Sequence, residues 1–154
     1  MLEVIDSHTH LDSPDLAPEQ DAVVQRALAA GVTRMITIGA SGVLASAYRA
    51  VELAALYPSV WATVGVHPHD AGGTFTKEEL IKLAVSPKVV GIGETGLDFF
   101  RDWSPKDKQY AAFITQIEVA LEVNKPLVIH SREAGEECLK TLIEHGAEKV
   151  GGVF

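Results

Sequence analysis

Short apolar runs rich in β-branched residues alternate along the chain with longer segments in which apolar side chains recur every three or four positions. The first pattern predicts strands and the second predicts amphipathic helices. We expect strands at residues 3–7, 33–38, 60–66, 89–94 and 127–130, and the beginning of another at 149–154. Helices are expected at residues 18–30, 42–57, 77–85, 104–124 and 132–145. The alternation indicates successive βα units with parallel strands.

Residues at the expected helix ends support these boundaries. Gly31 follows the first helix and Gly146 follows the last, and glycine commonly ends a helix. Ser104 and Pro105 are expected to open the helix at 104–124, with the serine as N-cap and the proline at the first helical position.

The order of elements fits either an open doubly wound sheet or a TIM (β/α)8 barrel, because both place sites beyond the carboxyl ends of parallel strands. A barrel usually needs about 250 residues, and this sequence has 154. The last residues, 151–154, lie inside an apolar strand pattern. We therefore expect one α/β domain over residues 1–154, an incomplete TIM barrel with the first five to six βα units and without its C-terminal strands.

Composition is that of a globular domain, with 47% hydrophobic and 22% charged residues. No stretch approaches the roughly 18 apolar residues of a membrane span. The single cysteine, Cys138, excludes an internal disulfide and fits a reducing compartment. We expect a cytoplasmic protein that has no membrane partner.

The net charge of −8 argues against a broad basic face for nucleic acid. It leaves room for an enzyme that meets phosphates through metal ions, because bound cations change the local field whatever the total charge.

Two histidines separated by one residue, His8 and His10, follow the first expected strand. Side chains at positions i and i+2 of a strand point to the same face, so both imidazoles can reach one metal ion. Asp6 is a candidate partner that orients a histidine, since a carboxylate often does so. The alternative for Asp6 is a turn or cap role.

Further polar groups follow three other expected strands. They include His67, Glu94 and His130. In a parallel α/β fold such positions meet at one face, so we expect these side chains to converge with the opening histidine pair.

Imidazole and carboxylate groups are ligands of divalent metals. The expected ligand set is His8, His10, Glu94 and His130. A carboxylate has two oxygens, so Glu94 can bridge two ions, and two ions about 3.5–4 Å apart can activate water and stabilise both oxygens of a phosphodiester cleavage. We expect two divalent ions (Mg, Mn or Zn) and a catalytic role for Glu94. The alternative for Glu94 is a strand-end carboxylate that caps a loop.

Four ordered segments resemble the signatures of TatD-like metal-dependent hydrolases, a branch of the amidohydrolase group. They are residues 6–12 (DSHTHLD), 65–69 (GVHPH), 91–98 (GIGETGLD) and 126–132 (PLVIHSR). The resemblance implies the N-terminal part of a TIM barrel that binds divalent metals and cleaves phosphodiesters, typically as a deoxyribonuclease working from DNA ends. DNA, or RNA, would then be the substrate.

The resemblance also implies roles for single residues. His8 and His10 would hold one metal, Glu94 would lie between two, and His130 would hold the second. His67 would lie in the substrate pocket, where an imidazole can contact a phosphate. A histidine directly after the closing Gly-Val-Phe and an aspartate near the last barrel strand are implied too, and neither is among the 154 residues. We expect the general base from that missing part, which leaves activity of this chain alone open.

Several neighbouring residues have two interpretations. Arg132 is expected at the start of the last helix, where its guanidinium and backbone donors can receive a phosphate. An ion pair of Arg132 with Glu133, Glu136 or Glu137 is an equally good interpretation. Asp98 is a candidate for orienting a ligand or a loop backbone, although we favour a role as a loop cap.

His67 and His69 form a second pair of histidines separated by one residue, so they are alternative metal ligands. We favour the substrate pocket for His67 and a structural role for His69. Phe99, Phe100 and Trp103 offer stacking surfaces for bases, although we favour a role in covering the barrel rim.

Two other functions remain open. One is a different amidohydrolase activity on a lactone, amide or phosphotriester, because the same ligands serve carbonyl chemistry. The other is a non-catalytic fragment that binds metal loosely or associates with a partner. Open sheet edges recruit other strands, so we also expect the isolated chain to self-associate.

Overall fold

The computed structural model describes residues 3–101 and 103–154. Within them strands and helices alternate. The strands are β1 (Val4–Thr9), β2 (Val32–Gly39), β3 (Val60–Val64), β4 (Val89–Asp98), β5 (Leu127–Arg132) and β6 (Gly152–Val153). The α-helices are α1 (Gln20–Ala29), α2 (Ala45–Leu56), α3 (Lys77–Ala84), α4 (Lys106–Val123) and α5 (Gly135–Glu144). Short 3-10 helices are η1 (Pro14–Glu19), η2 (Pro68–Asp70) and η3 (Ala147–Lys149).

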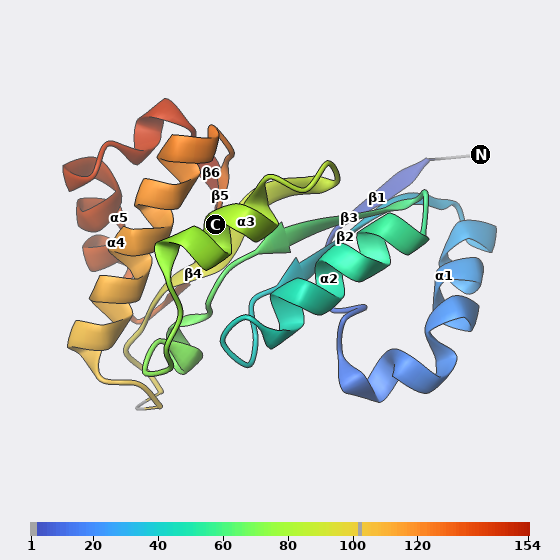
Figure 1. Ribbon diagram of the computed structural model, residues 1–154, viewed down its shortest axis with the longest axis horizontal. Coiled ribbons are helices and arrows are strands. Elements are labelled where there is room, and N and C mark those ends of the chain that lie inside the picture. The colour runs from blue at the N-terminus through green and yellow to red at the C-terminus, as the bar shows by residue number, and fades with distance from the viewer. Residues whose placement is uncertain (1–2, 102) are drawn as a thin grey trace.

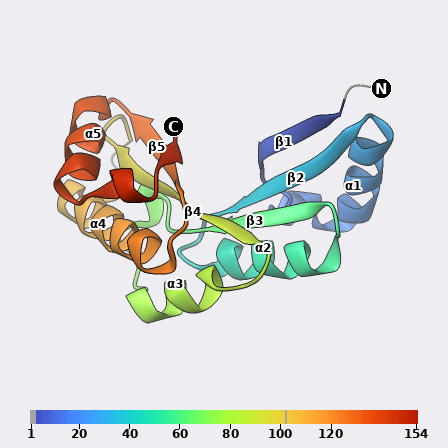
Figure 2. The same ribbon diagram turned by 90° about the horizontal axis from the view of Figure 1, so that it is seen from above.

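The six strands form one sheet in the order β1-β2-β3-β4-β5-β6. Every neighbouring pair is parallel. The sheet curves, with the helices along its outer side and with β1 and β6 at its two edges (Figures 1 and 2). The predicted α/β fold is confirmed as an open half-barrel.

Strand β4 is longer than predicted. It continues past residue 94 to Asp98, and Gly96 and Asp98 pair with His130 and Arg132 of β5. Gly96 has a φ of 144°, and any side chain there would collide with the carbonyl oxygen of His130. This glycine-rich stretch lacks the apolar alternation by which a strand is recognised. Glu94 therefore lies within a strand instead of beyond its end.

The prediction that Arg132 lies at the start of the last helix is wrong. Arg132 is the last residue of β5, and α5 begins at Gly135. Glu133, with a φ of 51°, turns the chain between the two elements. The pairing with the extended β4 keeps Arg132 in the sheet, so the backbone donors of the helix do not surround it.

Two other helix starts differ from prediction. The first predicted helix, 18–30, divides into η1 and α1, with Pro18 inside η1. Helix α4 has Pro105 at its N-cap and no side-chain cap. The hydroxyl of Ser104 instead accepts from the amide of Gly72 and donates to the carbonyl of His69. The predicted stops are confirmed, since Gly31 and Gly146 follow α1 and α5 with positive φ.

The main core lies between the sheet and helices α2 to α5. It is centred on fully buried side chains such as Ile92, Phe113 and Ile117. A smaller cluster around Val24 and Leu53 joins α1 and α2 to the sheet. Burial of this apolar surface stabilises the fold by about 25 cal/mol per Å². It holds in place the strands whose ends carry the site.

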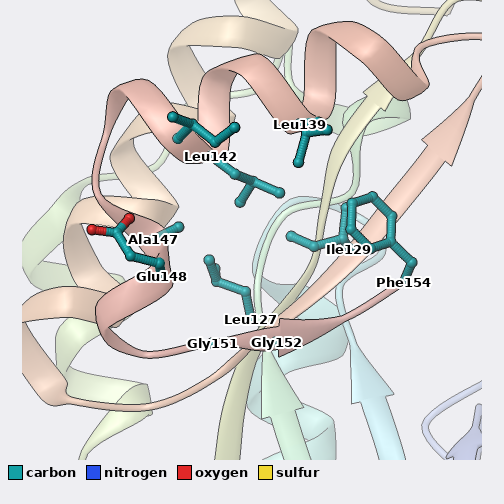
Figure 3. A pocket seen from close by; sticks show the side chains of 10 residues that line it. Leu127, Ile129, Leu139, Leu142, Ala147, Glu148, Gly151, Gly152 and Phe154 are labelled. Carbon is teal, nitrogen blue, oxygen red and sulfur yellow. The ribbon is translucent and has the colours of Figure 1, made fainter.

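Apolar side chains remain exposed near both edges of the sheet. Ile5 on β1 is 54% exposed and Phe154 after β6 is 70% exposed. Between α5 and the β6 edge of the sheet lies an apolar hollow of about 210 Å³, shown in Figure 3. Its lining includes Leu127, Ile129, Leu139, Leu142 and Phe154. No helix in the described part of the chain is long and apolar enough to cross a bilayer.

Candidate metal centre

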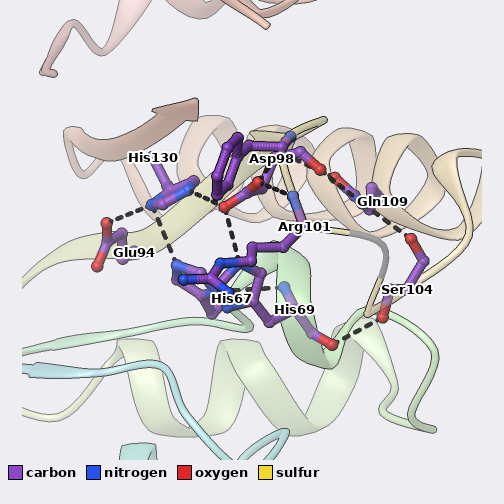
Figure 4. Close-up of polar contacts among 9 residues, drawn as sticks. His67, His69, Glu94, Asp98, Arg101, Ser104, Gln109 and His130 are labelled. Carbon is purple, nitrogen blue, oxygen red and sulfur yellow. Dashed lines mark hydrogen bonds and ion pairs between the residues drawn. The ribbon is translucent and has the colours of Figure 1, made fainter. Parts of the chain in front are cut away.

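Four strands of the half-barrel bring the predicted ligands and His67 to one end of the sheet. His8 lies near the end of β1 and His10 just beyond it, while Glu94 and His130 lie on β4 and β5. His67 follows β3 as the residue before η2. The structure thus brings residues from four separate segments together, and Figure 4 shows Glu94, His67 and His130 side by side.

The carboxylate of Glu94 stands between two groups of imidazoles. Its Oε2 lies 3.6 Å from Nε2 of His8, and its Oε1 lies 3.0 Å from Nδ1 of His130. His8, His10 and Glu94 each offer one ligand atom within 4.8 Å of the others, and so do His67, His69 and His130. The first group contains three of the four predicted ligands. The fourth, His130, lies in the second group, together with His67 and with His69, which was expected to be structural.

His130 is held from both sides by carboxylates. Its Nε2 lies 3.0 Å from Oδ2 of Asp98, opposite the contact of its Nδ1 with Glu94. Burial lowers the pKa of His130, but its contacts with these two carboxylates outweigh burial and raise the pKa above 6.5. Burial likewise raises the pKa of Glu94, and the hydrogen bond with His130 brings it below its ordinary value.

His67 is kept neutral by its surroundings. Its Nε2 lies 3.1 Å from Nδ1 of His130, and its Nδ1 accepts from the backbone amide of His69. Burial, followed by the positive charge of His130, lowers the pKa of His67 to about 4. The neutral imidazole is the form of histidine that binds metal, and in His67 its acceptor nitrogen, Nδ1, is hydrogen-bonded to the amide of His69.

Asp98 organises the wall of the site. Its side chain is fully buried, and Oδ2 lies 2.7 Å from Nε2 of His69 as well as beside His130. Oδ1 accepts from the backbone amides of Phe100 and Arg101. Burial raises the pKa of this carboxyl, but the amide of Arg101 and the two imidazoles together lower it to about 2. Asp98 therefore lies where a partner that orients a ligand was expected.

Two buried glutamines on α4 were missed by sequence reasoning. Gln109 accepts from the amide of Asp98 and donates to its carbonyl. Gln116 does the same for Val66, next to His67. They are seven residues apart, so they lie on the same face of the helix as its apolar residues. A buried polar residue in an apolar stripe was the signal available.

The other predicted residues lie nearby with different contacts. Asp6 accepts from the backbone amide of His8 and not from an imidazole. The guanidinium of Arg132 lies 3.9 Å above the ring of Phe100, and among the described ion pairs none joins Arg132 to an acid. Trp103, 65% exposed, has its ring 4.4 Å from that of His69.

The donors fit a divalent metal. Histidines that bind metal usually donate their other ring N–H to a carboxylate, and His130 has this arrangement because Nε2 faces Asp98 while Nδ1 faces Glu94. Glu94 has one oxygen toward each group of imidazoles. The donors are nitrogen and carboxylate oxygen, which suit zinc and manganese; His8 and His10 are exposed, and the other donors are partly buried.

Comparison with protein families gives a single assignment. The profile of the family described as TatD related DNase matches residues 5–154. The chain belongs to this TatD family. The assignment confirms the resemblance found in the four sequence motifs.

Relatives of known sequence place the chain within the TatD family. It is 41% identical over 151 residues to a protein of Escherichia fergusonii named 3'-5' ssDNA/RNA exonuclease TatD, covering 97% of this chain and 57% of the relative. It is 40% identical to the Bacillus subtilis protein YabD, named an uncharacterized metal-dependent hydrolase, covering 98% of this chain and 59% of YabD. The TatD chain described here thus spans less than two thirds of these relatives.

A solved structure supports the fold. The crystal structure of YjjV, a TatD homologue from Escherichia coli K12, superposes with a TM-score of 0.84 at 29% identity. The match covers 94% of this chain and 56% of YjjV. The open half-barrel of this TatD-family chain therefore corresponds to part of a longer TatD structure.

Proposed function

We propose that this chain carries the metal-binding part of a metal-dependent 3'-5' exonuclease that acts on single-stranded DNA or RNA. The observation that carries the proposal is the position of Glu94, with one carboxylate oxygen toward His8 and the other toward His130. The name of the Escherichia fergusonii relative supports the same substrate and polarity.

His8, His10 and Glu94 would hold one divalent ion, and Glu94 with His130 would hold a second. When bound, such ions activate water and neutralise charge on the phosphoryl oxygens. Asp98 accepts a hydrogen bond from Nε2–H of His130, so Nδ1 is the ring nitrogen that would bind an ion. Glu94 is thus the residue on which both ligand groups depend.

The substrate would enter a hollow of about 340 Å³ beside the ligands, which we name the histidine hollow. Its lining is His10, Ala40, Ser41, His67, His69, Asp70, Glu94 and Trp103. Neutral His67 can hydrogen-bond a phosphate oxygen, and exposed Trp103 can stack on a base. Arg132 at the end of β5 and Phe100 just after β4, stacked on each other, offer a cation and an aromatic surface nearby.

Three further assignments belong to this proposal. Residues 1–154 would form a single domain that is an incomplete barrel, and its open edges would associate with a second copy. A cytoplasmic location would agree with Cys138, a free and buried thiol; fractionation of cells producing the tagged protein would test it.

The proposal is tested with the chain and single-stranded DNA and RNA oligonucleotides that carry a dye at one end. We expect Mn²⁺-dependent release of mononucleotides from the 3' end, abolished by EDTA and by Glu94→Gln. Substrates with the dye on the 5' end would keep the dye and give labelled products that shorten one nucleotide at a time. The matched control is Glu136→Gln on the exposed face of α5, which should cleave like the wild type.

Other outcomes would contradict the proposal. Metal-dependent hydrolysis of a lactone, amide or phosphotriester with no action on oligonucleotides would favour a different amidohydrolase activity. Metal binding with no hydrolysis of any of these substrates would favour a non-catalytic fragment.

A further inference from the structure

A second hollow adjoins the histidine hollow at the ends of β1 and β2. Its volume is about 730 Å³, and it is lined by η1 and the first turns of α2. The lining residues are His10, Asp12, Ser13, Pro14, Ala17, Ser41, Gly42, Ala45, Ser46 and Arg49. Since His10 and Ser41 also line the histidine hollow, the two hollows are neighbours that share part of their lining, and we refer to them together as the groove. We name the second part the Arg49 hollow.

Among the residues that the structure describes, Arg49 is the one lysine or arginine that lines either hollow. Its Nη2 donates to Oε1 of Gln20 at 2.7 Å, and its Nη1 lies 3.3 Å from Oε2 of Glu52. A guanidinium has five N–H donors, so these contacts leave donors free. The pair with Glu52 is on the surface, where such pairs contribute little.

The acidic residues of the groove are already engaged. Asp12 accepts from the hydroxyl of Thr37 through Oδ1 and from that of Ser46 through Oδ2. Asp70, in the histidine hollow, accepts from the amide of Gly42. These hydrogen bonds offset part of the negative charge that an incoming phosphate would meet, and Arg49 supplies the cation.

We propose that the Arg49 hollow binds a phosphate of the substrate strand next to the one that is cleaved. The inference rests on the proposed exonuclease function. A nucleic acid strand carries phosphates at regular spacing, so a strand with its reactive phosphate beside Glu94 that runs into the neighbouring hollow brings an adjacent phosphate toward Arg49. Arginine binds phosphate in a bidentate manner, and such contacts position a strand without reading its bases.

Arg49 also has a structural contact, because it holds Gln20, whose Nε2 donates to the carbonyl of Leu11. The test must separate the two roles. Arg49→Gln removes the charge, and Arg49→Lys keeps it. Arg26→Gln is the matched control, since Arg26 pairs with Glu19 at the surface of α1 and lines neither hollow.

Binding is measured by fluorescence anisotropy with dye-labelled single-stranded dT and mixed-sequence oligonucleotides over a range of salt concentrations. We expect Arg49→Gln to weaken both by about tenfold, the effect of one charged hydrogen bond. The slope of log K against log salt should shrink by about 0.7, as for one phosphate contact on a single strand. Arg49→Lys should restore the salt slope, and Arg26→Gln should match the wild type.

Cleavage gives a second measurement. The ratio of kcat/KM for an oligonucleotide to that for bis(p-nitrophenyl) phosphate, which has no neighbouring phosphate, should fall about tenfold in Arg49→Gln. An unchanged salt slope, or equal losses on both substrates, would overturn the inference. If the wild type cleaves neither substrate, the proposed function fails, and the anisotropy measurement still decides whether Arg49 holds a phosphate.

Discussion

Nδ1 of His130 on β5 lies 3.0 Å from Oε1 of Glu94 on β4, although the two residues are 36 positions apart in the sequence. The contact leaves the other Glu94 oxygen toward His8. Two ligand groups therefore depend on the position of one carboxylate.

Replacing Glu94 by glutamine should abolish tight metal binding. The amide is neutral and cannot offer two anionic oxygens to the groups around His8 and His130. Changes beyond the direct ligands typically cost 10–100-fold in metal affinity, so we expect at least about a hundredfold loss for Mn²⁺ by titration calorimetry. Equal affinity of Glu94→Gln and wild type would exclude Glu94 as a ligand.

Replacing Asp98 by asparagine should change the stability in acid. With a pKa of about 2 against 3.8 in an ordinary setting, the carboxylate contributes roughly 2 kcal/mol of stability. Its pKa is lowered by folding, so this stability is present above pH 3.8 and is lost as the pH falls toward 2. The wild type and Asp98→Asn should differ most near pH 7 in urea unfolding, and the difference should shrink as the pH falls from about 4 toward 2.

Asp21→Asn, on the exposed face of α1, is the control for that experiment. Its unfolding curve should follow the wild type across the whole range. A constant difference between Asp98→Asn and wild type from pH 7 to pH 3 would show that the charge of Asp98 does not contribute.

His67 should titrate near pH 4 in the metal-free chain, while His130 titrates above 6.5. NMR of the labelled imidazole rings measures both. Because folding lowers the pKa of His67, this residue costs stability as the pH falls from 6.5 toward 4. Titration of His67 above 6.5 would contradict the buried, neutral ring described here.

Replacing Gln116 by methionine should destabilise the chain by about 2 kcal/mol, because the amide and carbonyl of Val66 lose buried hydrogen bonds. The ring resonances of His67, the next residue, should shift. Thr115→Met, at an exposed position of the same helix, is the control. Unfolding by urea measures the free energy, and an unchanged midpoint with unchanged His67 resonances would contradict the role of Gln116.

Self-association through the open edges should depend on Ile5, which is exposed on β1. A charge on an edge strand opposes pairing with another strand, so Ile5→Lys should shift sedimentation toward the monomer. Leu56→Lys, at an exposed apolar position on α2, should leave association unchanged. A wild-type chain that sediments as a monomer at all concentrations would refute the expectation.

The sequence by itself determined the alternation of strands and helices, the parallel sheet and the family, because each depends on local apolar periodicity or on contiguous motifs. It also supplied the residue types of the ligand set. The end of strand β4 could not be predicted from apolar periodicity, since its second half, from Glu94 to Asp98, has a glycine and polar residues where a strand pattern would be apolar. Because this half of β4 pairs with β5 as far as Arg132, Arg132 lies in the sheet and not in the predicted helix.

Only the tertiary structure decided which polar groups touch. Asp98 faces both His69 and His130, Gln116 supports the segment that carries His67, and Arg49 lies in a groove that begins at His10. These relationships join residues far apart in the chain, and their distances are set by how the sheet curves and the helices pack. Local sequence can place a polar residue such as Gln116 in the apolar stripe of a helix, but it does not determine which buried backbone group that residue contacts.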